Sequence, residues 1–231
     1  MTVPVVESGH TTGSGSSASV SVNAPTGTVD GSLLLAIVAS NGYGARSNFA
    51  PCVALGVNGS GSSAIYVNAF AWHQAGSAPA SYSFNFVDSA NVAIHCMRIT
   101  GADPVAPIPH VSHQTFTEND QSGAATQTAT GVTTTHADTL LITAYAQYAA
   151  AVRTYTAGSS QTEIADNGSN IVSLQTCKLT VASPGATGNK DSTPSASSGA
   201  TQCSLAIPVL PMDAKTVLGA TIGTVVRVAG V

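Results

Sequence analysis

Hydrophobic and polar residues alternate with a period of two along much of the chain, as in strands with one buried face. Residues 81–86 do so clearly, with Tyr82, Phe84 and Phe86 on one side. The runs 33–39 and 139–145 are mostly apolar, which is typical of strands covered on both faces. Further strands are expected at 17–22, 64–72, 92–99, 125–130, 170–179 and 200–207. No segment keeps a long helical stripe, so the pattern predicts an all-β fold.

The expected strands form two similar sets. The segments that correspond are 28–35 with 135–142, and 75–80 with 182–187. The halves are about 1–105 and 112–210, joined by a proline-rich linker at 104–109. We expect the halves to form the two sheets of one sandwich domain, 1–210, each sheet covering the apolar face of the other. Two separate tandem sandwiches are the alternative, but about 100 residues with few aromatic side chains would make a thin core.

Composition narrows the classes of function. Of the 231 residues, 8% are charged and 43% hydrophobic, and the net charge is -4. Soluble proteins are about 25% charged, so this surface is built largely from uncharged polar residues, as is common in extracellular β proteins and virion components. The seven Lys and Arg residues are scattered, which argues against nucleic-acid binding. The hydrophobic content argues against a disordered chain.

The N-terminal residues lack the basic and apolar regions of a secretory signal. The longest apolar run is far shorter than the ~20 residues that span a bilayer, so no membrane association is expected. The four cysteines stand far apart, which disfavours a zinc site. We expect buried thiols in a protein made in the cytoplasm, with a Cys96–Cys203 disulfide as the alternative.

At residues 25–36 the sequence resembles the jelly-roll-like sandwich modules of tailed-bacteriophage virion proteins and some bacterial surface proteins. Those modules tend to carry a Pro-x-Gly-x-x-x-Gly-Asp-Leu-Leu element, an Ala-x-x-Ala-Asp-x-Leu-Leu echo and a Gly-Ala-Thr-Gly turn. Residues 135–141 and 184–188 stand in the later two places. The family's Gly-Asp pair is Gly31-Ser32 here, and the acid stands one residue earlier. The resemblance extends to about residue 210 and implies a jelly-roll-like building block of a virion or surface, with no known catalytic centre.

Candidate catalytic and metal-binding residues have simpler structural explanations. Asp30 and Asp138 precede the two apolar strands, where a carboxylate commonly hydrogen-bonds a turn. His136 shares a face with Asp138 if that segment is extended, but no nucleophile motif accompanies them. The acidic stretches 118–120 and 163–168 are possible Ca²⁺ loops, although Asn167-Gly168 is a strong hairpin signal. The sequence predicts no catalytic residue, no metal site and no cofactor.

Aromatic residues offer one candidate ligand site. Trp72 lies within an expected strand and is predicted to fill the core. Tyr43 and Arg46 lie in a glycine-containing loop suited to contact, and they form the possible ligand loop, with a surface glycan as its ligand. The other tyrosines expected to be accessible are Tyr145, Tyr148 and Tyr155.

Residues 211–231 form an apolar, glycine-spaced C-terminal arm. A free arm rich in branched aliphatic residues would aggregate, so it should dock on its own domain or on a neighbouring subunit. We favour the neighbouring subunit because the strand pattern is complete at Leu210. The expected subunit-contact residues are Val217, Leu218, Ile222, Val225, Val226, Arg227 and Val228.

Two functions follow from these features. The first is a structural virion protein, a decoration or cementing protein of a phage capsid that contacts the major capsid protein or other virion proteins. Such a protein is expected to be a homo-oligomer, for which a trimer would suit a three-fold position. The alternative is a glycan-binding host-recognition module of a tail or head fibre. An enzyme ranks third, because no set of catalytic residues stands out.

Overall fold

The computed structural model describes residues 2–42, 46–47, 53–59, 65–109, 112–117, 126–196 and 201–212. These residues form seventeen β-strands in antiparallel sheets and contain no helix, so the all-β prediction is confirmed. It follows that this part of the chain holds no apolar helix of membrane-spanning length.

The first sheet belongs entirely to the N-terminal part of the chain. Its path is β1 (Val5–Val6), β7 (Ser81–Thr100), β3 (Leu33–Ser40), β6 (Tyr66–His73) and β5 (Val53–Gly59). Two further strands pair with β7, namely β2 (Thr11–Asn23) and β4 (Arg46–Ser47). The strands expected at 81–86 and 92–99 are therefore one continuous strand of twenty residues.

A bend in β7 explains why its sequence looks like two strands. The pairing of β2 with β7 is interrupted between Ser17 and Ser19, which pair with Ala90 and Asn85. The intervening exposed residues of β7 include Val87 and break the buried–exposed alternation. Such an irregularity bends both strands while most of the ladder stays paired. The first part of β7 therefore lies in a different layer from the second.

The C-terminal part of the chain forms the remaining sheets. The order of the five-stranded sheet is β13 (Thr162–Ser169), β14 (Val172–Val181), β11 (Thr139–Tyr148), β17 (Thr201–Val209) and β8 (Ser112–Thr117). A three-stranded sheet has the order β12 (Tyr155–Ala157), β16 (Lys190–Pro194) and β9 (Gln127–Ala129). A small ribbon pairs β10 (Thr133–Thr134) with β15 (Gly185–Ala186).

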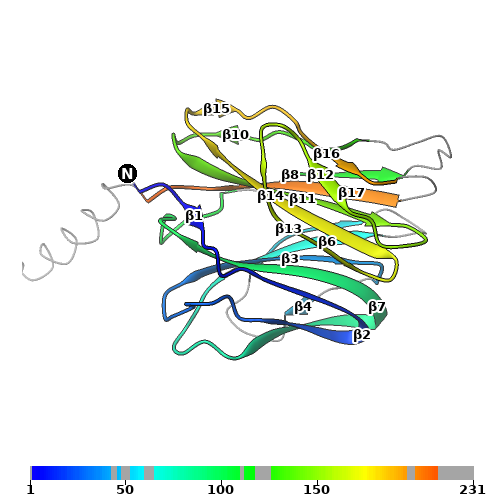
Figure 1. The fold of residues 1–231 in the computed structure, drawn as a ribbon. Helices are drawn as coiled ribbons and strands as arrows, with labels where there is room; N and C mark the ends of the chain where they lie inside the picture. The colour runs from blue at the N-terminus through cyan, green and yellow to red at the C-terminus, as the bar shows by residue number, and fades with distance from the viewer. Residues whose placement is uncertain are drawn as a thin grey trace, which may run out of the picture.

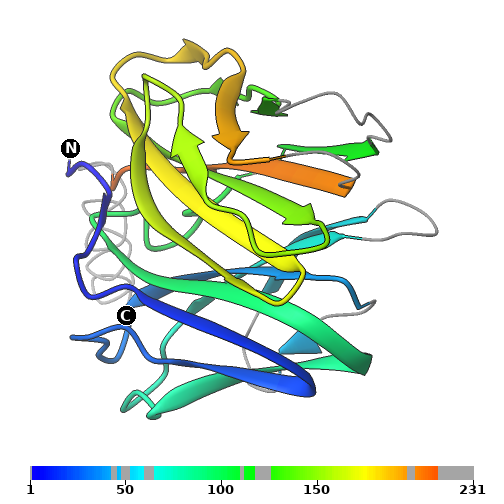
Figure 2. The same cartoon turned by 45° about the vertical axis from the view of Figure 1, so that its right-hand side comes forward.

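The sheets stack in layers (Figure 1), and the turned view shows the same order (Figure 2). The five-stranded sheet packs on the first sheet through the central core, a cluster that includes Leu35, Ile37, Ile142 and Leu205. Beyond the first sheet, the bent part of β7 and β2 covers a second cluster rich in aromatic side chains. Beyond the five-stranded sheet, the three-stranded sheet covers a third cluster.

This stacking explains the two continuously apolar strands. Along β3, Leu33, Leu35 and Ile37 enter the central core, whereas Leu34 and Val38 enter the aromatic cluster. Every residue of β3 is buried, so the predicted coverage on both faces is confirmed. Strand β11 likewise contributes alternate residues to the central and third clusters.

The two outer cores differ in chemistry. In the aromatic cluster, the rings of Phe70 and Phe84 pack at a tilt of 47° with centroids 5.2 Å apart, and Trp72 meets Tyr82 edge-on at 5.0 Å. Each such pair stabilises the fold by about 0.5–1.5 kcal/mol beyond burial alone. The prediction that Trp72 fills the core is confirmed, since the residue is 5% exposed.

The other outer core contains many buried hydrogen-bonding side chains. Gln161 Oε1 accepts hydrogen bonds from the hydroxyls of Thr143 and Tyr145. Gln175 donates to Glu163 at 2.7 Å and accepts from Ser192 at 2.5 Å. The expectation that Tyr145 and Tyr155 are accessible is wrong, because both are buried. The sheet that contains β12 and β16 covers the outer face of β11, and the two tyrosines belong to the third cluster, which lies between them.

His95 connects the two large sheets. Its Nε2 lies 2.7 Å from Asn167 Oδ1 and its Nδ1 lies 2.8 Å from Thr176 Oγ1. Asn167 donates its amide N–H to Gly13 O at 3.1 Å, so its Oδ1 accepts from His95. Burial lowers the pKa of His95 from 6.5 to about 3, against an opposing effect of the Asn167 hydrogen bond. The imidazole is therefore neutral at physiological pH.

The role of Asn167 corrects the expected hairpin. Asn167 and Gly168 lie within β13, paired with Leu174 and Ser173, and the turn comes at Asn170, which has a φ of 50°. Short-range turn propensity predicted the earlier position. The bonds of Asn167 to His95 and Gly13, remote in sequence, hold it in the strand instead.

The described cysteines are buried as reduced thiols, as expected. Cys203 lies in the central core, Cys96 in the aromatic cluster and Cys177 in the third cluster. The alternative of a Cys96–Cys203 disulfide is wrong, because the two thiols lie in different cores. Cys52 lies outside the described residues.

Candidate functional site

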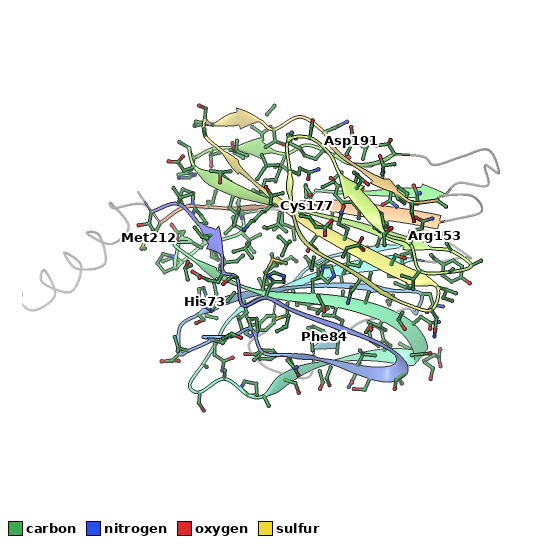
Figure 3. All side chains as sticks on the ribbon, viewed as in Figure 1. His73, Phe84, Arg153, Cys177, Asp191 and Met212 are labelled. Carbon is green, nitrogen blue, oxygen red and sulfur yellow. The ribbon has the colours of Figure 1, made fainter. Side chains whose placement is uncertain are left out.

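Both ends of the described chain meet the linker between the two large sheets. Met212 donates its backbone N–H to Gly101 O at 2.9 Å and accepts from Thr2 N at 3.3 Å. Leu210 donates to Pro107 O at 2.8 Å. Figure 3 shows Met212 at the same end of the molecule as His73, with Arg153 at the opposite end. We call this end of the molecule, where Thr2, Gly101, Pro107 and Met212 lie together, the end face.

The linker backbone has a defined shape at the end face. Gly101 has a φ of 72°, and a Cβ there would lie 2.6 Å from Val3 O, so glycine is required for both conformation and space. Asp103 Oδ1 accepts the N–H groups of Val105 at 2.8 Å and Ala106 at 3.0 Å. This side-chain turn directs the next residues over the edge of the first sheet.

The linker and the first sheet enclose an apolar groove with a volume of about 480 Å³. One wall comprises Leu33, Leu55 and Trp72 from β3, β5 and β6. The other comprises linker residues, including Val105 and Ile108. Val105 is 79% exposed, whereas Ile108 is partly buried against the central core. A concave apolar surface of this size is typical of a site that receives a small ligand or side chains of a partner.

A more polar hollow of about 330 Å³ adjoins the groove and shares Leu33 and His73 with it. Asp30 Oδ1 accepts the N–H of Gly76 at 2.6 Å, which links two turns of the first sheet. Asp30 therefore hydrogen-bonds the backbone of a turn, but this turn is 46 residues away and not the one at the entrance to β3 that was predicted. Arg98 and Glu7 form an ion pair with 3.6 Å between Nη2 and Oε2. A partly exposed pair of this kind stabilises the fold by only about 0–1 kcal/mol.

The other acidic candidates lie elsewhere. Asp138 has a φ of 55° and lies with His136 in a turn. The segment is therefore not extended, and the two side chains do not share a strand face. Burial raises the pKa of Asp166 from 3.8 to about 6, against its hydrogen bond from Tyr155 N at 2.8 Å. Across the described ranges, no three His, Cys, Asp or Glu side chains are placed to hold a metal ion.

Most of the predicted contact residues lie outside the described residues. These include Tyr43, Glu118, Asp120 and all seven arm residues, Val217, Leu218, Ile222, Val225, Val226, Arg227 and Val228. Arg46 begins β4, where its backbone pairs with Asn85 of β7. What the structure adds is the surface beside which the arm leaves the fold.

Sequence reasoning missed the groove because its walls are far apart in the chain. The available signal was the linker itself, in which Val105 and Ile108 stand among three prolines. Comparison of this chain with protein-family models, curated protein sequences and solved structures finds no match. The functional argument therefore depends on the residues and their arrangement.

Proposed function

We propose that this chain is a structural protein of a virus particle, a decoration or cementing protein of a bacteriophage capsid. The observation that carries the proposal is the end face, where an apolar segment follows Met212 beside an apolar groove. The same end holds the motif through which the sequence resembles phage virion modules, since Asp30 and Gly31 line the adjoining hollow.

The arm fits a role in contacts between subunits. Seven of the sixteen residues from 216 to 231 are Val, Leu or Ile, and Arg227 is the one charged residue among them. Burying each such side chain contributes about 1.5–3 kcal/mol, so a docked arm would hold subunits firmly. Two backbone segments, at Thr2 and at Gly101, hold the root of the arm at Met212, and a pull on the arm therefore reaches the folded domain.

We also propose that the domain consists of two jelly-roll-like units with the same topology. The orders β1-β7-β3-β6-β5 and β8-β17-β11-β14-β13 support this, because each strand has a counterpart at the same sheet position. The outer strands correspond too. In the first unit β2 and β4 both pair with the first part of β7. In the second unit β9 and β12 both pair with β16, which takes the place of that part of β7. An experimental structure in which the strands of one order fail to superpose on those of the other would refute the duplication.

Two units packed back to back suit a cementing role. Their inner sheets bury the central core, and each unit turns its outer layer away from the other. One chain therefore presents two separate surfaces and can contact neighbours on opposite sides. Association through symmetric or near-symmetric surfaces is the usual route to closed assemblies.

The test is the copy number of this chain in purified particles, measured by quantitative mass spectrometry against the major capsid protein. Copies in the hundreds would support a capsid decoration protein. A handful of copies would favour the glycan-binding alternative and direct mutagenesis to Tyr43 and Arg46. Absence of the chain from particles would refute both virion functions.

A further inference from the structure

We propose that the groove at the end face receives residues 213–231, the part of the C-terminal arm that follows Met212, from a second copy of this chain. The inference rests on the proposed function and names its contact: the arm of one subunit docks between the linker and the first sheet of the next. It assigns a partner to the groove and a receiving site to the arm.

The first argument is the direction in which the chain leaves the fold. Leu210 pairs with Pro107, Pro211 with Ala102, and Met212 with Gly101. The chain from 210 to 212 therefore runs antiparallel to residues 101–107. It starts beside the groove at Pro107 and ends at Gly101, next to the N-terminal residue Thr2. At Met212 it has already passed residues 105–108, which form one wall of the groove.

The exit direction separates the arm from the groove of its own subunit. An arm entering that groove would have to reverse its direction after Met212. The next residues are Asp213-Ala214-Lys215-Thr216-Val217-Leu218, and the first glycine is Gly219. Tight reversals favour Gly, Pro, Asn, Asp or Ser, and between Asp213 and Gly219 no such residue occurs, so the stretch 214–218 is better suited to continue outward. Nineteen residues reach as far as roughly 60 Å when extended, which is ample to cross to a neighbour.

The second argument is chemical fit. The walls of the groove come from Leu33, Leu55, Trp72, Val105 and Ile108, which match the Val, Leu and Ile residues of the arm. Val105 is 79% exposed in the single chain, and docking would remove it from water. Apolar contact around a buried aromatic residue is the usual centre of a protein interface.

The test uses the full chain and four substitutions at three valines. Val105→Asp places a charge in the groove, and Val226→Asp places one in the arm. Val87→Asp is the matched control, since Val87 is 65% exposed on the bend of β7 and does not line the groove. Val105→Lys repeats the groove test with the opposite charge. Near-ultraviolet circular dichroism checks that each variant is folded.

Sedimentation velocity across a range of concentrations measures self-association. The wild type and Val87→Asp should associate alike, and each groove or arm variant should raise the dissociation constant about tenfold or more, or 1.4 kcal/mol. The decisive sample mixes Val105→Asp with Val226→Asp. The first supplies an intact arm and the second an intact groove, so the mixture should form a one-to-one complex that neither forms alone.

Three results would overturn the inference. These are a wild type that stays monomeric at every concentration, association that the groove variants leave unchanged, and a mixture that does not recover. A monomeric wild type whose Trp72 fluorescence changes equally in Val105→Asp and Val226→Asp would show that the arm occupies its own groove. Copy number in particles is a separate measurement, so a chain that associates through arm and groove but is absent from virions would refute only the proposed function.

Discussion

Lowering the pH from about 7.5 to about 5 should remove roughly 2 kcal/mol from the free energy of unfolding through His95 alone. The folded protein holds His95 neutral, with a pKa of about 3, because the ring is buried between the two large sheets. In the unfolded chain its pKa returns to about 6.5. Between these values the unfolded state binds more protons, so stability falls as the pH falls, starting near pH 6.5 and levelling near pH 3.

The magnitude follows from the unfolded state. At about pH 5 an exposed histidine is almost fully protonated, and RT ln(1 + 10^1.5) is about 2 kcal/mol. Asp166 acts in the opposite direction, because its raised pKa of about 6 makes the folded state bind the extra proton. A pH profile of the wild type alone therefore mixes the two effects. The charge of His10 is a smaller cause of the lowered pKa of His95, after burial.

The assay isolates His95 by comparing variants. Urea unfolding, followed by the fluorescence of the single Trp72, gives the free energy of unfolding of the wild type, His95→Gln and His10→Gln at both pH values. His95→Gln should be less stable at about pH 7.5, since its bonds to Asn167 and Thr176 are altered, but should lose about 2 kcal/mol less than the wild type on acidification. His10→Gln should retain most of the wild-type loss. Equal losses in the wild type and His95→Gln would refute the reasoning.

Three further predictions concern the end face. Asp30→Ala should lower the free energy of unfolding by about 1 kcal/mol, because Gly76 N loses its acceptor; no change in a urea titration would contradict this. Gly101→Ala should lower the melting temperature more than Gly76→Ala, although φ is positive at both, because only Gly101 faces Val3 O at 2.6 Å; equal shifts would refute the steric argument. Removing residues 213–231 should leave the melting temperature nearly unchanged yet abolish attachment to particles. An unfolded truncated protein would mean that the arm completes its own domain.

Local pattern was sufficient to predict much of the fold. The alternation at 17–22 lies in β2, and the apolar runs at 33–39 and 139–145 lie in β3 and β11, buried on both faces. These predictions succeed because hydrophobic periodicity directly records which faces are buried. Short strands such as β4 and β12 were not predicted, since two or three residues carry no periodic signal.

The errors come from contacts that are distant in the sequence. Asn167 was expected in a turn but is held in β13 by His95, 72 residues away. Tyr145 was expected to be accessible, yet a separate small sheet covers it. The groove combines residues from β3, β5, β6 and the linker, so no local window of sequence contains it. At Asp30 the sequence predicted a hydrogen bond to a turn, but it could not identify that turn as the one at Gly76, 46 residues away.

The position of β17 has a mechanical consequence for an anchored arm. This strand leads to Met212 and is paired along both edges, with nine residue pairs to β11 and six to β8. Tension applied through the arm acts along the strand axis and strains these hydrogen bonds together in shear, instead of peeling them one at a time. A central strand loaded lengthwise yields only when its whole ladder slips, so a pull through Met212 would be resisted by both of these ladders at once.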